Sequence, residues 1–260
     1  MKLFRSLLLA VLTLSIATEL TAQKNQREFY ELRTYHYQGD SSEQRLDNYL
    51  KNALVPALHR ANIQKVGVFK SSKHDTATIK KFVVLIPFRS LDMIDKLDGM
   101  LEKDNAYQSA GSDYINAAHN NSPYLRIEKT ILKAFPGMPQ ARKSGLKGDP
   151  EERIYELRSY ESATEKLYRS KVKMFNTGDE IGIFDRLGFN AIFYSEVLAG
   201  RSMPNLIYMI SFDNLESRNE HWKAFGNDPA WKKLLTDKQY DNTVSHIDSY
   251  YLTALPYSDL

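Results

Sequence analysis

The chain has 260 residues, a formal net charge of +3, 42% hydrophobic and 12% aromatic residues, and no cysteine. This composition is typical of globular domains and excludes an intrinsically disordered chain. The missing cysteine excludes disulfides, a thiolate nucleophile and a lipid-modified cysteine anchor. The near-neutral charge, without a basic stripe, argues against a nucleic acid as partner.

The first residues have the pattern of a secretory signal peptide. Lys2 and Arg5 precede an apolar run at 7–17, and a small residue, Ala22, follows at a plausible cleavage point. The run is shorter than the ~20 apolar residues that a membrane span needs. We therefore expect residues 1–22 to be removed on export. The mature protein is then expected to be periplasmic or secreted, with no stable membrane anchor.

Apolar periodicity predicts six elements in the first half of the chain, which we take as residues 27–135. They are a strand at 27–36, a helix at 46–61, strands at 64–70 and 80–88, a helix after Ser90, and a strand at 124–135. Pro56 lies within the first helix and predicts a kink there, because proline lacks a backbone donor and its ring clashes one turn back.

A stretch rich in proline, glycine and basic residues, 136–151, predicts an exposed linker. The second half, 152–260, repeats the order of the first. The predicted elements are a strand at 153–160, a helical stretch at 164–187 broken near Gly178, strands at 189–197 and 205–212, a helix carrying Trp222, and a strand at 244–254.

The two halves also share sequence. The segment FYELRTY at 29–35 returns as IYELRSY at 154–160, and DNAY at 104–107 returns as DPAW at 228–231. The common order β-α-β-β-α-β is that of the ferredoxin-like motif, whose sheet has both helices on one face. We therefore predict an α+β protein of two tandem ferredoxin-like repeats, which cover each other's bare sheets as a pseudo-two-fold barrel.

The opening YELR-x-Y strand, GFNAIFYSEV at 188–197 and HWKAFGNDPAW at 221–231 resemble the NIPSNAP family. The resemblance covers nearly all of the mature chain and is clearest in the second copy. It implies the fold of the dimeric α+β barrel superfamily and no settled reaction. The first copy departs from the pattern, with Leu97-Asp98 where His221-Trp222 is expected. Two fused copies satisfy the family's pairing in one chain, so the prediction is a monomer, or a homodimer formed through exposed edge strands.

Alternation along the opening strands places Glu31 and Arg33, and their equivalents Glu156, Arg158 and Tyr160, on one face. We expect this polar face to look into the space between the sheets and to bind a ligand there. The apolar face, with Tyr30 and Leu32, is then expected to meet the helices.

The last strand of the second copy carries His246 and Asp248 on one face, next to the opening strand. His246 titrates near neutrality, so it is the candidate acid or base, and Asp248 is expected to orient its ring. The alternative is that the clustered charges only neutralise each other in the interior. His221 is expected at the edge of a cleft, and Trp222 in the core.

The six histidines show no H-x-x-x-H or H-E-x-x-H spacing, which argues against a dedicated zinc or copper site. No cofactor motif is present in the sequence, and none is expected. Two functions remain open. In one, the barrel holds a small organic molecule, with an anion paired by Arg33 and Arg158, and performs cofactor-independent isomerisation, dehydration or oxygenation. In the other, a filled barrel is a non-catalytic interaction module with an exposed apolar patch.

Overall fold

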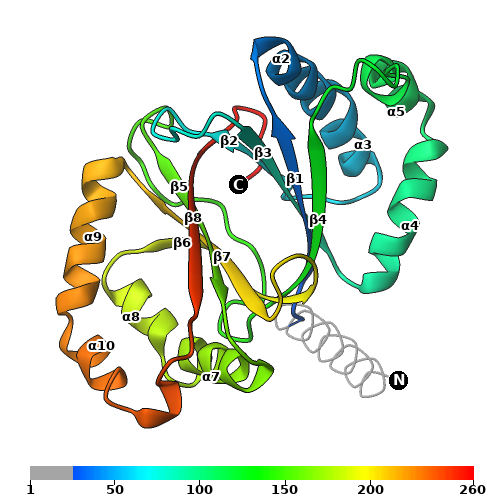
Figure 1. Cartoon of the computed structure of the whole chain (residues 1–260). Coiled ribbons are helices and arrows are strands. Elements are labelled where there is room, and N and C mark those ends of the chain that lie inside the picture. The colour runs from blue at the N-terminus through cyan, green and yellow to red at the C-terminus, as the bar shows by residue number, and fades with distance from the viewer. Residues whose placement is uncertain (1–25) are drawn as a thin grey trace, which may run out of the picture.

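The computed structural model describes residues 26–260, which form a closed barrel of eight strands with helices outside it (Figure 1). The predicted signal peptide, 1–22, lies outside the described residues. The strands are β1 (Phe29–Tyr37), β2 (Gly67–Ser71), β3 (Lys80–Phe88), β4 (Arg126–Ala134), β5 (Ile154–Glu161), β6 (Asn190–Ala199), β7 (Asn205–Phe212) and β8 (His246–Ala254). Each predicted strand end lies within three residues of the observed one.

The helices belong to two sets, one in each repeat. The first set is α2 (Asp40–Tyr49), the π-helical segment η1 (Leu50–Leu54), α3 (Val55–Arg60), α4 (Leu91–Glu102), α5 (Asn105–Ala110) and α6 (Ser112–Ile115). The second set is α7 (Glu165–Asn176), α8 (Glu180–Arg186), α9 (Leu215–Asn227), α10 (Pro229–Leu234) and the 3-10 turn η2 (Lys238–Tyr240). Within residues 26–260, no helix has the length and apolar character of a membrane span.

Each repeat contributes a four-stranded antiparallel sheet in the ferredoxin-like order, β4-β1-β3-β2 and β8-β5-β7-β6. The predicted fold class is therefore confirmed. The two sheets join edge to edge, through β2 with β8 and β4 with β6, rather than pressing face to face. This closure leaves no free edge among the described strands, so the expectation that exposed edges pair two chains is wrong.

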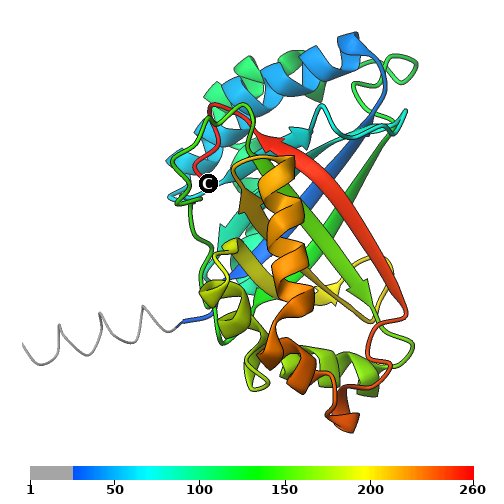
Figure 2. The ribbon, with the colours of Figure 1, turned by 90° about the vertical axis from the view of Figure 1, so that its left-hand side faces the viewer.

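The two helix sets cover opposite outer sides of the barrel (Figures 1 and 2). One buried cluster lies between the first sheet and its helices and includes Leu46, Leu50 and Val84. A second, rich in aromatic rings, lies under the helices of the second repeat. The third fills the barrel itself and draws side chains from both repeats, including Tyr30 and Phe193, whose ring centroids are 5.6 Å apart.

The predicted kink at Pro56 takes the form of a π-helical turn. Pro56 lies in the first turn of α3, immediately after η1. Because proline offers no N–H and its ring would clash with the carbonyl one turn earlier, the helix widens before it rather than breaking. The predicted interruption near Gly178 is confirmed, since α7 ends at Asn176 and α8 begins at Glu180.

The recurring aspartates of the DNAY and DPAW segments are helix caps. The Asp104 carboxylate accepts a hydrogen bond from the Tyr107 amide at the start of α5. The Asp228 carboxylate accepts from the amides of Ala230 and Trp231 at the start of α10, where Pro229 occupies the first turn. These segments recur because a short helix needs its free amides satisfied, a structural role.

One end of the barrel is packed shut, and we call it the closed end. Leu260, only 3% exposed, and Ala141 belong to the cluster inside the barrel. The Asp259 carboxylate accepts a hydrogen bond from the Val66 amide and so fixes the C-terminus there (Figure 2). Met138 and Ala141 are both buried, so the segment between the repeats is not the wholly exposed linker that its composition predicts.

Candidate functional site: the open end of the barrel

The predicted orientation of the opening strands is wrong. Tyr30 and Leu32 point into the barrel, and Glu31, Arg33 and the equivalent residues of β5 point towards the helices. An eight-stranded barrel has room for little more than its own inward side chains. The aromatic and aliphatic residues therefore fill it, and the charged ones are left to find partners beneath the helix layer.

Glu156 is fully buried under α9 and receives hydrogen bonds from four side chains. Arg218 donates to both carboxylate oxygens at 2.8 and 3.0 Å, and Arg158 donates at 2.5 Å. The Trp222 indole N–H and the Ser249 hydroxyl each donate at 2.8 Å. Burial alone raises the pKa of Glu156, but the bonds from Arg218 and the charge of Arg158 outweigh burial and hold the pKa below its usual value. This fully bonded carboxylate has a structural role.

Arg158 and Tyr160 belong to the same buried network. The Arg158 guanidinium lies 4.5 Å from the Trp222 ring centre and donates to the Tyr160 hydroxyl at 3.1 Å. Tyr208 donates to the same hydroxyl at 2.8 Å. These groups are bonded to one another beneath the helices and do not line the pocket described below, so Arg158 and Tyr160 are not the anion-binding groups that the sequence predicts.

The equivalent pair in the first repeat is simpler. Arg33 donates to Glu31 at 2.6 Å, and Lys129 lies 3.8 Å from the same carboxylate. Leu97 stands where the second repeat has His221, and Asp98 where it has Trp222, so this copy lacks the indole donor. Both Glu31 and Arg33 are buried on the helix side and do not line the pocket described below.

His221 is half-buried on the outer layer, away from the pocket. Its Nδ1 atom is 2.7 Å from the Ser217 carbonyl oxygen, and its ring stacks edge-on against Phe189 and Phe212. Trp222 packs on the aromatic cluster beside it, as predicted. The role predicted for His221 at a cleft edge therefore finds no support in its surroundings.

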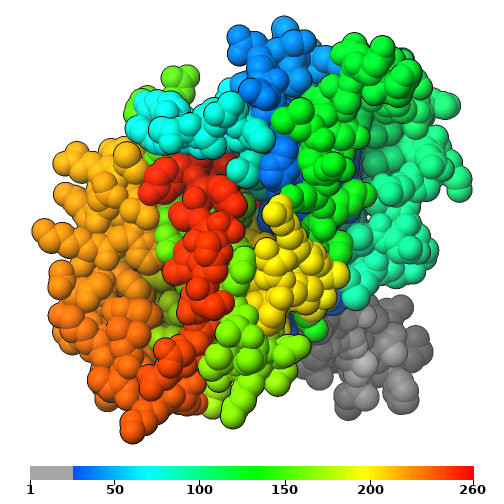
Figure 3. Space-filling view, in the orientation of Figure 1, coloured from blue at the N-terminus to red at the C-terminus, as the bar shows by residue number. Residues whose placement is uncertain are grey.

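The end of the barrel opposite Leu260 is not filled, and we call it the open end. It faces the viewer in Figures 1 and 3, and Figure 3 shows the surface hollowed between β8, β1 and the β6–β7 turn. The cavity measures about 410 Å³. Its polar or charged lining residues are Thr34, His36, Lys81, Glu128, Thr130, Ser159, Glu161, Arg201, Ser202, Asn205, His246, Asp248 and Tyr250.

One side of this pocket carries two positive charges, Lys81 from the first repeat and Arg201 from the second. The Lys81 ammonium lies 4.3 Å from the centre of the Tyr250 ring. Arg201 donates to Glu128 at 2.8 Å, and His36 Nε2 is 3.4 Å from the same Glu128 oxygen. Burial lowers the pKa of His36; Glu128 opposes this shift, and Lys81 and Arg201 support it. The His36 imidazole is therefore neutral near pH 7.

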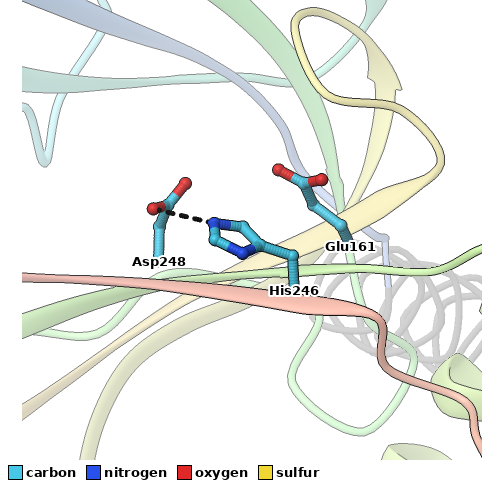
Figure 4. Close-up of side chains that lie close together, drawn as sticks. All are labelled: Glu161, His246 and Asp248. Carbon is cyan, nitrogen blue, oxygen red and sulfur yellow. Dashed lines mark hydrogen bonds and ion pairs between the residues drawn. The ribbon is translucent and has the colours of Figure 1, made fainter.

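The other side carries His246, Asp248 and Glu161, which we call the His246 cluster (Figure 4). His246 Nε2 lies 3.3 Å from Asp248 Oδ1, and one ligand-type atom from each of the three residues lies within 4.8 Å of the others. The strand register explains the grouping, because Glu161 is paired with His246, and Ser159 with Asp248, across β5 and β8. The predicted pair of His246 and Asp248 is thus together in the pocket, joined by Glu161 instead of Glu156.

Sequence reasoning missed Glu161, Lys81, Arg201 and Asn205. Glu161 directly follows the repeated YELR-x-Y segment, as His36 does in the first copy. A correct register between the first and last strands would have shown it beside His246. Asn205 is the first residue of β7, and Lys81, its equivalent in the first repeat, is the second residue of β3. Arg201 lies on a turn, where alternation makes no prediction.

Residues 155–259 match the family model named NIPSNAP. A candidate monooxygenase from Fusobacterium nucleatum superposes with a TM-score of 0.55 at 10% identity, over 88% of this chain and 93% of that chain. An anthrone oxidase-like protein superposes with a TM-score of 0.53 at 12% sequence identity, over 88% of this chain and 92% of that chain. A candidate monooxygenase from Lactobacillus acidophilus superposes with a TM-score of 0.52 at 10% sequence identity, over 88% of this chain and 94% of that chain. No curated protein matches significantly. These likenesses confirm the barrel fold, and they extend over almost the whole length of each neighbour.

Proposed function

We propose that this barrel, whose second repeat is a NIPSNAP domain, binds a small organic molecule with an acidic group in its open end. The observation that carries the proposal is the cavity of about 410 Å³ that both repeats line and that side chains leave unfilled. Ligand pockets of proteins are typically about 300–1,000 Å³, with a few polar groups that orient the ligand.

The charges of the pocket indicate how such a molecule would lie. Lys81 forms no ion pair among the described residues, so its ammonium, 4.3 Å from the centre of the Tyr250 ring, is available for the acidic group. Arg201 is already paired with Glu128. Lys81 thus takes the anion-pairing role predicted for Arg33 and Arg158, which lie beneath the helices. The apolar floor, formed by Leu32, Val83, Leu157 and Ile207, would receive the rest of the molecule.

The chemistry we propose is proton transfer by His246. Its ring opens to the pocket, and Asp248 at 3.3 Å holds one ring nitrogen, which leaves the other for a substrate proton. Isomerisation or oxygenation without a bound cofactor needs such a base to generate a carbanion or enolate. The names of the neighbouring structures support this reaction class by analogy alone, because one fold hosts many activities.

Export and a monomeric state complete the proposal. The signal-like pattern of residues 1–22 supports export to the periplasm or medium. Closure of the barrel within one chain supports a monomer, since each sheet already has its partner. Cell fractionation tests the first point, and sedimentation of the mature chain tests the second. Recovery in the cytoplasm, or a dimer at micromolar concentration, would contradict them.

The rival function, an interaction module, predicts a filled interior. Only the closed half of the barrel meets that description. Native mass spectrometry of protein from its natural host decides between the two, because a retained small molecule is expected only for the binder. Thr34→Trp, which fills the pocket, should abolish retention. Lys166→Trp, on the exposed face of α7, is the matched control and should retain the molecule. Retention by both variants would place the ligand elsewhere.

Turnover is tested separately once that molecule is known. His246→Ala should reduce kcat about 10²–10⁴-fold, the usual contribution of a positioned acid or base. Its effect on KM should be small, since the ring is not assigned to binding the acidic group. Unchanged kcat would remove His246 as a catalyst and leave a binding protein.

A further inference from the structure

The His246 cluster has the composition and spacing of an ion site. A nitrogen and two carboxylates converge from adjacent strands, within 4.8 Å of one another. Zinc–nitrogen and zinc–oxygen bonds are about 2.0–2.2 Å long, so ligand atoms around one ion lie about 3.0–3.5 Å apart. His246 Nε2 and Asp248 Oδ1, at 3.3 Å, already have this separation. A Glu161 carboxylate oxygen lies within 4.8 Å of a ring nitrogen of His246 and of a carboxylate oxygen of Asp248.

The charges of the cluster are only partly balanced by protein groups. Glu161 has no hydrogen bond or ion pair from its carboxylate within residues 26–260, and Asp248 has only His246 as an ion-pair partner. The other carboxylate of the pocket, Glu128, is neutralised by Arg201. Two carboxylates close together in a partly enclosed pocket repel each other, and a cation between them offsets this repulsion. The uncompensated charge therefore points to a bound cation.

A buried acceptor beside the cluster supports the same conclusion independently. Asn205 is 2% exposed, lines the pocket, and is paired directly with Glu161 across β5 and β7. Its Nδ2 donates to the Ser159 hydroxyl at 2.9 Å, but its Oδ1 has no hydrogen-bond partner. A buried acceptor without a donor is costly. A water molecule held by an ion at the cluster would supply that donor.

We propose that Glu161, His246 and Asp248 bind one divalent transition-metal ion, with Zn²⁺ or Mn²⁺ as the ions that suit one imidazole and two carboxylates. Three protein ligands leave positions open towards the cavity for water or a ligand oxygen. The ion occupies the imidazole lone pair, so with an ion bound His246 is a ligand and not the proton acceptor proposed above. The binding of an acidic group at Lys81 does not depend on this choice. Ion binding is measurable without any knowledge of the reaction.

The first repeat contains a natural counterpart that cannot bind an ion. The equivalents of Glu161, His246 and Asp248 are His36, Arg126 and Glu128. A guanidinium has no lone pair to donate and stays protonated, so arginine excludes a cation from that position. The same position of the sheet therefore carries a histidine in one copy and an arginine in the other, which makes His246→Arg a substitution already present in the related fold.

The test is titration of the untagged full chain with ZnCl₂ by calorimetry, and with MnCl₂ by electron paramagnetic resonance. We expect one site with a micromolar or tighter Kd for Zn²⁺. His246→Arg, which copies the first repeat, and Asp248→Asn should each weaken it at least tenfold. Glu128→Gln makes the same acid-to-amide change at the equivalent position and should leave Kd within twofold.

Three results would overturn the proposal. The first is no Zn²⁺ or Mn²⁺ bound at millimolar concentration by the wild-type chain. The second is unchanged Kd in both His246→Arg and Asp248→Asn. The third is an equal loss in Glu128→Gln, which would mean that the pocket's overall charge, and not the cluster, holds the ion. Thermal melting of each variant without metal shows that a loss of binding is not a loss of fold.

Discussion

Replacing Glu156 by glutamine should be among the most destabilising single changes in this protein. Both carboxylate oxygens of Glu156 face only donors. Oε1 accepts from Arg158, Arg218 and Ser249, and Oε2 accepts from Arg218 and Trp222. The amide group of glutamine must place an N–H against donors in either orientation, and two arginines lose their buried counter-charge. Breaking a buried pair in this way costs about 3–5 kcal/mol.

The control is Glu31→Gln at the equivalent position of the first repeat. Glu31 receives one hydrogen bond, from Arg33, and lies 3.8 Å from Lys129. A glutamine there can keep its carbonyl oxygen towards Arg33, so we expect a loss of about 1–2 kcal/mol, close to one charge-assisted hydrogen bond.

Urea unfolding followed by tryptophan fluorescence measures both free energies of unfolding, and Trp222 makes the signal local to the network. Thermal melting is an independent readout, since about 2–4 °C of Tm corresponds to 1 kcal/mol in a chain of this size. A loss below about 1.5 kcal/mol for Glu156→Gln, or equal losses for the two variants, would refute the conclusion that the second-repeat network is the tighter one.

Three further outcomes are expected. The pKa of Glu156 is lowered in the folded state, so its contribution to stability is present above its unfolded pKa, about 4.3, and is lost as the pH falls below it. The free energy of unfolding should therefore fall less steeply with acid pH in Glu156→Gln than in the wild type, and an unchanged slope would contradict this. Lys171 bonds to the fully buried Glu180 at 2.8 Å, and burial raises the pKa of Glu180. Lys171→Met should therefore cost about 3–5 kcal/mol at pH 8 and less as the pH falls, because protonation of Glu180 removes its unpaired charge; a pH-independent loss in urea unfolding would argue against it. Leu260→Ala should cost about 2–3 kcal/mol by opening the closed end, whereas Leu235→Ala, at an exposed site, should change stability by less than about 0.5 kcal/mol.

The sequence by itself determined the architecture. The repeated YELR-x-Y strands, the periodic helices and the break at Gly178 follow from local preferences and from period, which act over a few residues and can be recognised along the chain. The ferredoxin-like strand order was predictable for the same reason. The match of residues 155–259 to the NIPSNAP family model agrees with a resemblance of sequence motifs, which periodicity does not supply. So was the pairing of His246 with Asp248, since residues two apart on a strand share a face.

Only the tertiary structure decided what each face meets. Alternation separates Glu156 from Leu157, but it does not say which of them faces the helices, because both sides of a strand in this barrel are covered. The answer depends on Arg218 and Trp222, more than 60 residues away, which bring partners for Glu156 to the outer side. Likewise, a slip of one residue in the pairing of β5 with β8 would turn Glu161 to the opposite face from His246. The site therefore depends on contacts between distant strands, which the repeat alone does not specify.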